Sequence, residues 1–158
     1  MTPSGAKLRI ALGADHAGFQ VKESVKRYLE SAGYAVDDVG TRSEESVDYP
    51  DFAVGAARRV AGGQDDLGIL MCGTGIGMTI VANKVPGVRA ALVCDPATAR
   101  LAREHNNANV LAMGGRVLSS EKAIEIVREF LSAEFAGGRH ERRVNKIMQL
   151  DQAREAKK

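Results

Sequence analysis

Hydrophobic residues recur along this chain in two alternating patterns. Five runs are short and almost entirely apolar, which is typical of strands buried on both faces of a parallel sheet. The segments between them carry apolar residues three or four positions apart, as in Val21, Val25 and Leu29, and this spacing predicts helices with one buried face. We expect strands at residues 8–14, 34–39, 67–72, 88–94 and 110–113. We expect helices at residues 19–32, 51–61, 78–84, 96–105, 119–135 and 139–154.

The alternation of strands and helices predicts a parallel sheet. In a strand–helix–strand unit the helix carries the chain back along the sheet, so that the next strand runs parallel to the first, and this connection is right-handed. We therefore predict an α/β fold, a Rossmann-like three-layer α/β/α sandwich with a five-stranded sheet, in a single domain over residues 1–158. Residues 1–6 form a short polar lead-in that we expect to be loose. Gly137 and Gly138 interrupt the chain before a highly charged last helix, residues 139–154, which we expect to pack on a partner subunit.

Composition narrows the class of protein. The chain has 158 residues, 44% of them hydrophobic and 27% charged, which suits one ordinary globular core. A net charge of +2 gives no reason to expect nucleic acid or a charged membrane surface as a partner. We find neither a signal peptide nor a spanning segment. The two cysteines, Cys72 and Cys94, lie on apolar strand-like runs, which predicts reduced thiols in a cytoplasmic protein; we interpret Cys94 as structural.

The junction after the third predicted strand is the strongest candidate for chemistry. Cys72 ends that strand, and Gly73, Gly75 and Gly77 follow, so the backbone can turn tightly and expose N–H groups before the next helix. Ligands of open α/β sheets bind at the carboxyl ends of strands. A cysteine is more often a small buried hydrophobe. Its position beside an amide-rich loop favours a thiol that moves a proton or attacks, with the amides holding negative charge.

Other polar residues fall at defined ends of the predicted elements. Asp15 and His16 follow the first strand and so reach the same edge as Cys72. The alternatives are a helix N-cap for Asp15 and a simply exposed His16. His105 ends a helix, which places it at the opposite edge of the sheet; it either interacts with the helix carbonyls or meets Cys72 across a subunit interface.

Arginines form a candidate anion site. Arg139 and Arg143 lie four positions apart on one helical face, and Arg116 emerges from the fifth strand. They form either a solvated basic face or a phosphate clamp, for which guanidinium groups are suited. We interpret His140 as structural, and Tyr49 is either a packing residue or part of the site.

A series of motifs resembles the type B ribose-5-phosphate isomerases, whose wider family includes the subunits of galactose-6-phosphate isomerase. The resemblance covers nearly the whole chain, from about Leu8 to Ile147, in the right order. The motifs are Gly13-Ala14-Asp15-His16-Ala17-Gly18, Asp48-Tyr49-Pro50, Cys72-Gly73-Thr74-Gly75-Ile76-Gly77, Ala82-Asn83-Lys84, His105-Asn106, Gly114-Gly115-Arg116-Val117 and Gly137-Gly138-Arg139-His140.

This resemblance implies an aldose–ketose isomerase that interconverts ribose 5-phosphate and ribulose 5-phosphate without a metal or organic cofactor. The family's catalytic positions fall on Cys72 as the base, His105 for ring opening and Thr74 in the glycine-rich loop. Some members use a glutamate just after this loop; here that position is Met78, which assigns the chain to the cysteine-base group. Members are dimers or dimers of dimers with sites at subunit interfaces. The family's sugar and phosphate contacts match Asp15, His16, Tyr49, Gly73, Thr74, Gly75, Ile76, Gly77, Asn106, Arg116, Arg139 and Arg143.

Three alternatives stay open at this point. Related enzymes act on six-carbon sugar phosphates such as allose 6-phosphate and galactose 6-phosphate, and the sequence does not give the size of the pocket. A nucleotide-binding Rossmann module is disfavoured, because G-x-G-x-x-G is missing after the first strand. A cysteine hydrolase or transferase would use Cys72 and His105 as a nucleophile–base pair.

Overall fold

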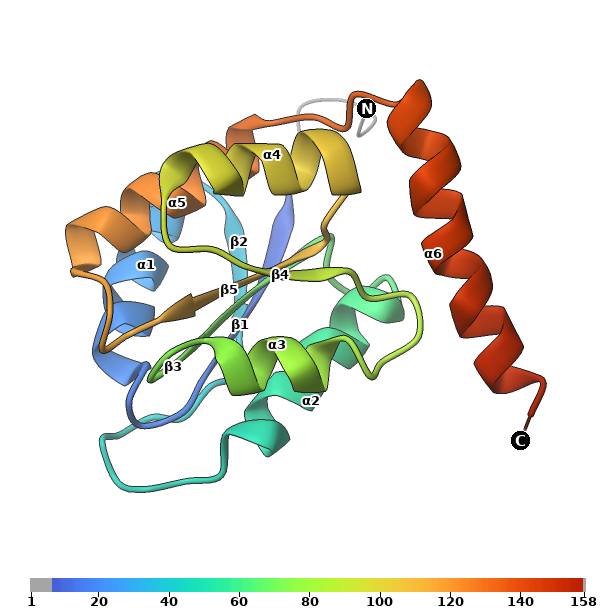
Figure 1. Ribbon diagram of the computed structural model, residues 1–158. Helices are drawn as coiled ribbons and strands as arrows, with labels where there is room; N and C mark the ends of the chain where they lie inside the picture. The colour runs from blue at the N-terminus through green and yellow to red at the C-terminus, as the bar shows by residue number, and fades with distance from the viewer. Residues whose placement is uncertain (1–6, 158) are drawn as a thin grey trace.

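The computed structural model describes residues 7–157, and within them the chain forms one parallel sheet of five strands in the order β2-β1-β3-β5-β4 (Figure 1). The carboxyl ends of β1, β3 and β5 lie next to one another, since Ala14 pairs with Met71 and Cys72 pairs with Gly114. The predicted α/β fold is confirmed. The strands are β1 (Arg9–Ala14), β2 (Ala35–Asp38), β3 (Leu67–Cys72), β4 (Ala90–Leu92) and β5 (Val110–Gly114).

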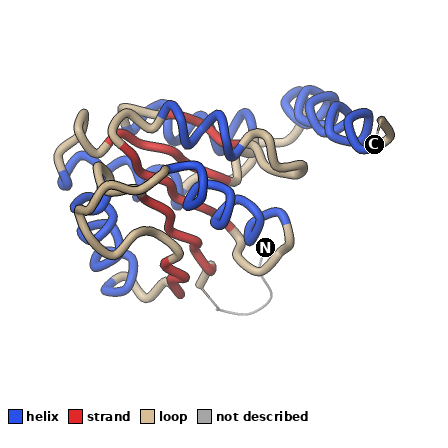
Figure 2. The backbone as a smooth tube through the Cα atoms, turned by 90° about the horizontal axis from the view of Figure 1, so that it is seen from below, coloured by secondary structure: helices blue, strands red, loops and turns tan. Residues whose placement is uncertain are grey.

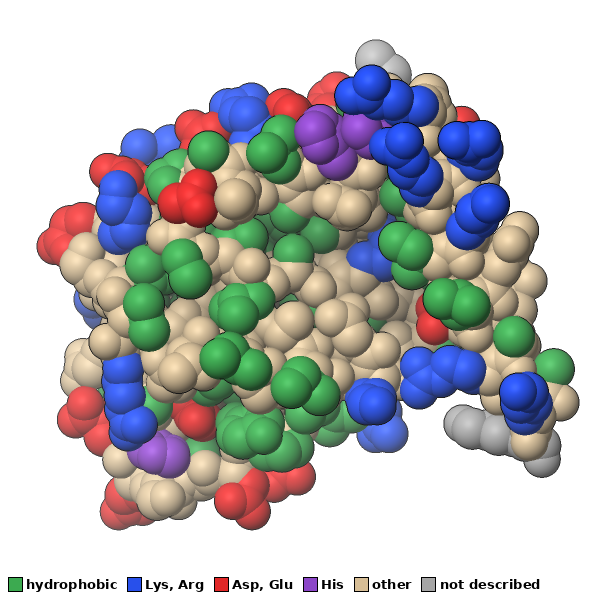
Figure 3. All heavy atoms as spheres, viewed as in Figure 1, with side chains coloured by type: hydrophobic (Ala, Val, Ile, Leu, Met, Phe, Trp, Pro, Cys, Tyr) green, Lys and Arg blue, Asp and Glu red, His purple; other side chains and the backbone are tan. Residues whose placement is uncertain are grey.

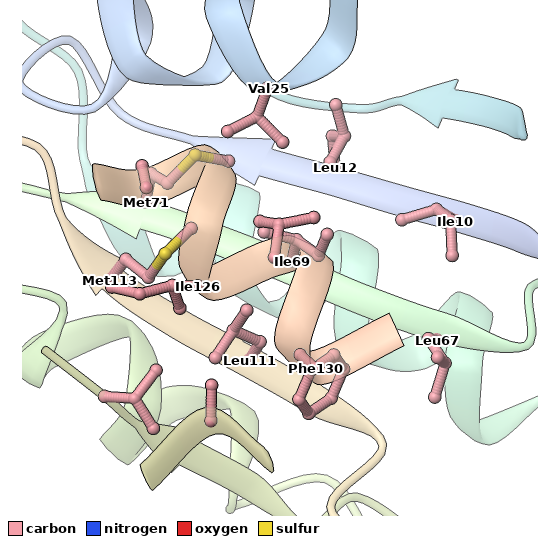
Figure 4. Close-up of a cluster of buried hydrophobic side chains, with 14 of the residues drawn as sticks. Ile10, Leu12, Val25, Leu67, Ile69, Met71, Leu111, Met113, Ile126 and Phe130 are labelled. Carbon is pink, nitrogen blue, oxygen red and sulfur yellow. The ribbon is translucent and has the colours of Figure 1, made fainter. Parts of the chain in front are cut away.

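Helices cover both faces of the sheet, and each face has its own apolar cluster. Helices α1, α4 and α5 pack on one face, around the alternate strand residues labelled in Figure 4, such as Leu12 and Ile69. Helices α2 and α3 pack on the other face, against Leu70 and Cys72. The side chain of Cys72 therefore points toward α2 and α3. The helices are α1 (Phe19–Ser31), α2 (Tyr49–Ala61), α3 (Ile76–Ala82), α4 (Pro96–Asn106), α5 (Ser120–Ser132) and α6 (Arg139–Glu155).

Several boundaries differ from those predicted. The fourth strand is much shorter than residues 88–94, so Cys94 lies beyond it and is exposed. The free edge of this strand is covered by a side chain: the Asn83 amide donates to the Ala90 carbonyl at 3.0 Å and accepts from the Ala90 N–H at 2.8 Å. Helix α2 starts at Tyr49 because Pro50 fits its first turn. Helix α5 ends at Ser132, since Ala133 is already extended.

Helix α6 stands away from the layered body, as both backbone views show (Figures 1 and 2). Its far end is tied to the body through Asp151, whose carboxylate accepts from the Gly87 N–H at 2.8 Å. Val144 is buried, whereas Ile147 and Leu150 are 45% and 65% exposed. An apolar side chain left open on a helix suits a partner subunit, so the packing of α6 on a second chain stays a prediction. The loose lead-in predicted for residues 1–6 lies outside the described residues.

Candidate active site

A pocket of about 460 Å³ opens at the carboxyl edge of the sheet. It lies where β1, β3 and β5 end and the loops into α1, α3 and α5 begin. Most of the residues predicted for this edge meet there. The pocket is lined by Asp15, Tyr49, Cys72, Gly73, Thr74, Ile76, Gly77, Ile80 and Arg116.

Cys72 is 5% exposed, and its sulfur accepts a hydrogen bond from the Gly75 N–H at 3.1 Å. This contact depends on the backbone of Gly75, which has a φ of +80°. A Cβ at that position would lie 2.6 Å from Leu92 Cδ1 and 2.8 Å from the Met113 carbonyl carbon, so glycine is required twice over. The loop thus directs one N–H toward any negative charge that forms on the sulfur.

The other glycines of the loop make room for neighbouring side chains. A Cβ on Gly77 would come within 2.5 Å of the Tyr49 ring, so this glycine lets the ring close over the loop. At Gly73 the carbonyl accepts from the Arg116 N–H at 3.0 Å, and the Arg116 guanidinium lies over the same residue. Thr74 is exposed, and its hydroxyl oxygen accepts from the Ile76 N–H at 3.3 Å. An aromatic ring and a cation therefore flank an amide-rich turn.

Asp15 and His16 are both held by backbone amides. One carboxylate oxygen of Asp15 accepts from the N–H groups of Ala17 and Gly18, at 2.9 and 3.0 Å. The N-cap alternative is wrong, because the N-cap of α1 is Gly18 and no side chain caps this helix. Asp15 instead accepts within the turn that precedes α1, and it also lines the pocket. The Nδ1 atom of His16 accepts from the Val47 N–H at 3.2 Å, which leaves Nε2 to carry the ring proton.

A second cluster lies at the opposite edge of the sheet. His105 and Asn106 end α4, and Arg139, His140 and Arg143 lie in the first turns of α6. In Figure 1 the carboxyl ends of β3 and β5 lie at the left, whereas α4 ends at the right beside the start of α6. Histidine side chains accordingly show at two separate places on the face in Figure 3. None of these five residues lines the Cys72 pocket; Asn106 lines a separate cavity between β4 and α6.

Two features of these clusters were missed from the sequence. The first is a contact of His140, whose ring stacks on that of His105 with centroids 4.2 Å apart and planes 9° from parallel. Partial burial lowers the pKa of His140, and the charges of His105, Arg139 and Arg143 lower it further. Ile80 also lines the Cys72 pocket, and its spacing from Ile76, one helical turn, is the signal that could have found it.

The contacts at the carboxyl end of β2 disfavour a nucleotide-binding site. A nucleotide-binding Rossmann fold uses an acidic residue near this position to hold a ribose. Here Asp38 accepts from the fully buried Lys22 at 2.6 Å and from Lys26 at 3.2 Å. Burial acts to raise the Asp38 pKa, but the Lys22 and Gly40 hydrogen bonds outweigh it, and the pKa is lowered. This carboxylate is therefore already paired with two lysines of the protein.

The arrangement also disfavours the hydrolase alternative within one chain, because Cys72 and His105 lie at opposite edges and form no nucleophile–base pair. Across residues 7–157, no cluster of three or more His, Cys, Asp or Glu side chains has the arrangement of a metal site. Of the helices that the structure describes, none has the length and apolar character needed to span a bilayer.

A buried thiol beside an amide-rich turn, at the open edge of a parallel α/β sheet, defines a class of site suited to proton transfer on small anionic substrates. The comparisons with known proteins identify the family. The family model described as Ribose/Galactose Isomerase matches residues 10–147, and the chain belongs to this family.

Two curated relatives and one solved structure illustrate the similarity. Ribose-5-phosphate isomerase B of Escherichia coli (strain K12) is 47% identical over 146 residues, which cover 92% of this chain and 98% of the relative. D-erythrulose-4-phosphate isomerase of Pectobacterium atrosepticum is 46% identical, covering 89% of this chain and 93% of the relative. The structure of Clostridium thermocellum ribose-5-phosphate isomerase B is 48% identical with a TM-score of 0.91, covering 92% of this chain and 99% of that one.

Proposed function

We propose that this chain is an aldose–ketose isomerase that interconverts D-ribose 5-phosphate and D-ribulose 5-phosphate. The observation that carries the proposal is the Cys72 sulfur, which accepts from the Gly75 N–H at 3.1 Å in a pocket that also holds Arg116. The substrate class is supported by the family of the chain and by the names of its relatives. The two free cysteines, and the metabolic role of these relatives, support a cytoplasmic location.

Ring opening comes first, because ribose 5-phosphate rests as a closed furanose. We assign this step to His105, which takes the proton of the O1 hydroxyl and delivers a proton to the ring oxygen. The bond between C1 and the ring oxygen breaks, and C1 becomes an aldehyde. The phosphate is held meanwhile by Arg116, Arg139 and Arg143 together with His16, so that C2 lies against Cys72.

Proton transfer then moves the carbonyl from C1 to C2. The Cys72 thiolate takes the proton from C2, the electrons of that bond form the C1–C2 double bond, and O1 becomes negative. Amides of the 73–77 loop, which includes Thr74, stabilise this enediolate. The proton returns from the thiol to C1, and the O2 proton passes to O1. We assign that second proton to Asp15 and the sugar contacts to Tyr49 and Ile76 of the pocket and to Asn106, which lies beside His105 in the second cluster.

We further propose that each site is completed by a second copy of the chain. The Cys72 pocket contains Arg116 but neither His105 nor the two arginines of α6. Its rim is apolar and open: Ile76 and Ile80 are 52% and 57% exposed, and Figure 3 shows hydrophobic side chains gathered over α3. A partner seated on this rim would bury it and bring its own His105, Arg139 and Arg143 to the pocket.

An assay of sugar-phosphate isomerisation by the purified protein tests the proposed function. The ketose formed from ribose 5-phosphate is measured against that from allose 6-phosphate, galactose 6-phosphate and erythrose 4-phosphate, all with EDTA present. We expect the highest kcat/KM with ribose 5-phosphate. The four-carbon arm is included because one relative is named for such a substrate. A higher kcat/KM on another sugar phosphate would reassign the substrate. Thermal stabilisation of the protein by nucleotides, with no turnover of any sugar phosphate, would overturn the proposed isomerase activity.

A further inference from the structure

Two imidazole rings from distant parts of the chain form a parallel stack. His105 lies in the last turn of α4 and His140 in the first turn of α6. Their centroids are 4.2 Å apart and their planes differ by 9°. Both side chains are partly buried. We assign ring opening to His105, whereas the proposed reaction gives His140 no role. The stack therefore brings a residue without an assigned role against His105.

The backbone between α5 and α6 builds this stack. Ala136 donates its N–H to the carbonyl of Glu104 at 3.0 Å, which fastens the linker beside His105. Gly137 and Gly138 then take φ values of 64° and 55°, in the region that side chains disfavour. After this turn α6 starts, with His140 N–H donating to the Gly137 carbonyl at 3.0 Å. Two glycines at positive φ thus turn the chain so that the His140 ring lies over the His105 ring.

The stack is the contact that orients the His105 ring. Among residues 7–157 the structure shows no hydrogen bond to that ring, and the stack on His140 is the specific contact that can restrain its plane. A ring held by its face keeps both edge nitrogens available to a ligand.

We propose that His140 is a positioning residue: its ring holds the His105 imidazole in the plane from which it transfers the ring-opening proton. This inference rests on the ring-opening role proposed for His105. The charged groups that act on His140 are His105 from α4 and Arg139 and Arg143 from α6, and they lower its pKa together with partial burial.

The competing interpretation is that His140 binds the phosphate beside Arg139 and Arg143. The two roles differ in what they affect. A phosphate ligand changes KM for every phosphorylated substrate, whereas a positioning residue for ring opening changes the rate of those substrates that must open a ring. Ribulose 5-phosphate separates the two, because its O5 carries the phosphate and it cannot close a five-membered ring.

The kinetic test uses the full chain with three substitutions. His140→Ala removes the ring, His140→Phe keeps a flat ring without a charge, and Lys146→Ala is a control on the exposed part of α6. We expect His140→Ala to lower kcat for ribose 5-phosphate by about 10- to 100-fold, the range for lost positioning of an acid–base group. His140→Phe should recover most of this loss. Exchange of solvent deuterium into C1 of ribulose 5-phosphate should stay close to the wild-type rate in both variants.

Three results would overturn the proposal. One is wild-type kcat in His140→Ala. Another is a matched rise in KM for both sugars in His140→Ala and His140→Phe, which would make His140 a phosphate ligand. The third is a parallel loss of isomerisation and deuterium exchange, which would indicate general damage. If His140→Ala does not fold, His140→Phe decides alone, since poor ring opening with intact exchange in that variant contradicts a role based on stacking.

A second readout does not depend on activity. The carbon-bound ring protons of His105, followed by NMR, should carry a ring-current shift from His140 that His140→Ala removes and His140→Phe keeps. Lys146→Ala should leave the shift unchanged. A wild-type protein that shows this shift but does not isomerise ribose 5-phosphate would refute the proposed function and keep the stack. An active protein without the shift would refute the positioning role alone.

Discussion

At the scale of single residues, the side chain of Cys72 is buried and yet lines a pocket that is open to a substrate. It is the last residue of β3, so α2 and α3 cover its side chain while the next residues open into the pocket. The Gly75 N–H at 3.1 Å gives its sulfur a polar neighbour in apolar surroundings. A sulfur placed in this way suits proton transfer better than a fully enclosed one, because a substrate can reach it.

Replacing Cys72 by Ser tests its role as the base. A hydroxyl is a far weaker acid than a thiol and supplies almost no anion at neutral pH, so we expect turnover of ribose 5-phosphate to fall at least about 100-fold. Substrate binding, measured by calorimetry, should be largely kept because the shape is kept. Near-normal turnover would remove Cys72 from the mechanism.

The two arginines of α6 allow a matched comparison on one helix. Arg139→Ala and Arg143→Ala should each weaken binding of the sugar phosphate by about 1.5–3 kcal/mol, the range for hydrogen bonds to charged groups. Free ribose should be affected little, and Arg142→Ala, which removes the same charge from an exposed neighbouring position, serves as the control. Equal losses for free and phosphorylated sugar would assign these arginines to folding or assembly.

At the scale of elements, the turn between β3 and α3 shows how glycine positions chemistry. Positive φ at Gly75 turns its N–H toward Cys72, and the missing side chain lets Leu92 and Met113 approach. Helix α3 begins at Ile76, two residues before the predicted Met78, because the left-handed Gly75 ends the turn and starts the helix. The geometry of the site is therefore a property of this turn.

A pair of glycine substitutions tests this interpretation. Gly75→Ala should lower the free energy of unfolding by about 2–5 kcal/mol, since backbone strain of about 1–2 and overpacking of about 1–3 kcal/mol both apply. Gly55→Ala is the control: it lies inside α2 with no atom within 4 Å of the added Cβ, and should raise stability by about 0.5–1 kcal/mol. Urea unfolding of both variants measures the contrast, and equal effects would contradict it.

At the scale of the whole molecule, one chain holds the proposed site in two halves. The thiol and the loop lie at the carboxyl edge of the sheet, while His105 and the arginines of α6 lie beyond the opposite edge. A two-fold dimer can join the halves, because such an interface repeats each contact and builds two equal sites. The exposed rim of the pocket and the detached α6 are the surfaces available for this contact.

Mixing two inactive variants tests the shared site. Cys72→Ser and His105→Ala are unfolded and refolded together, so that random pairing makes about half of the dimers mixed. A mixed dimer has one site with both substitutions and one with neither, so about a quarter of normal activity should return. Subunit exchange is verified with differently tagged chains. An inactive mixture with proven exchange would place both residues in the same site of one chain.

The sequence by itself determined the elements, the class of fold and the carboxyl-edge half of the site. A helix or strand that is buried on one face or on both has apolar residues at a regular spacing along the sequence. A strand that ends in Cys72 places this residue at the edge of a parallel sheet where ligands bind. The edge position of β4, the pairing of Asn83 with its free edge and the entry of Ile80 into the pocket were decided by the tertiary structure. So was the stack of His140 on His105, which depends on how a glycine turn returns α6 to the end of α4. Contacts of this kind join residues far apart in the chain, and they leave no local pattern because only the packed fold brings the partners together.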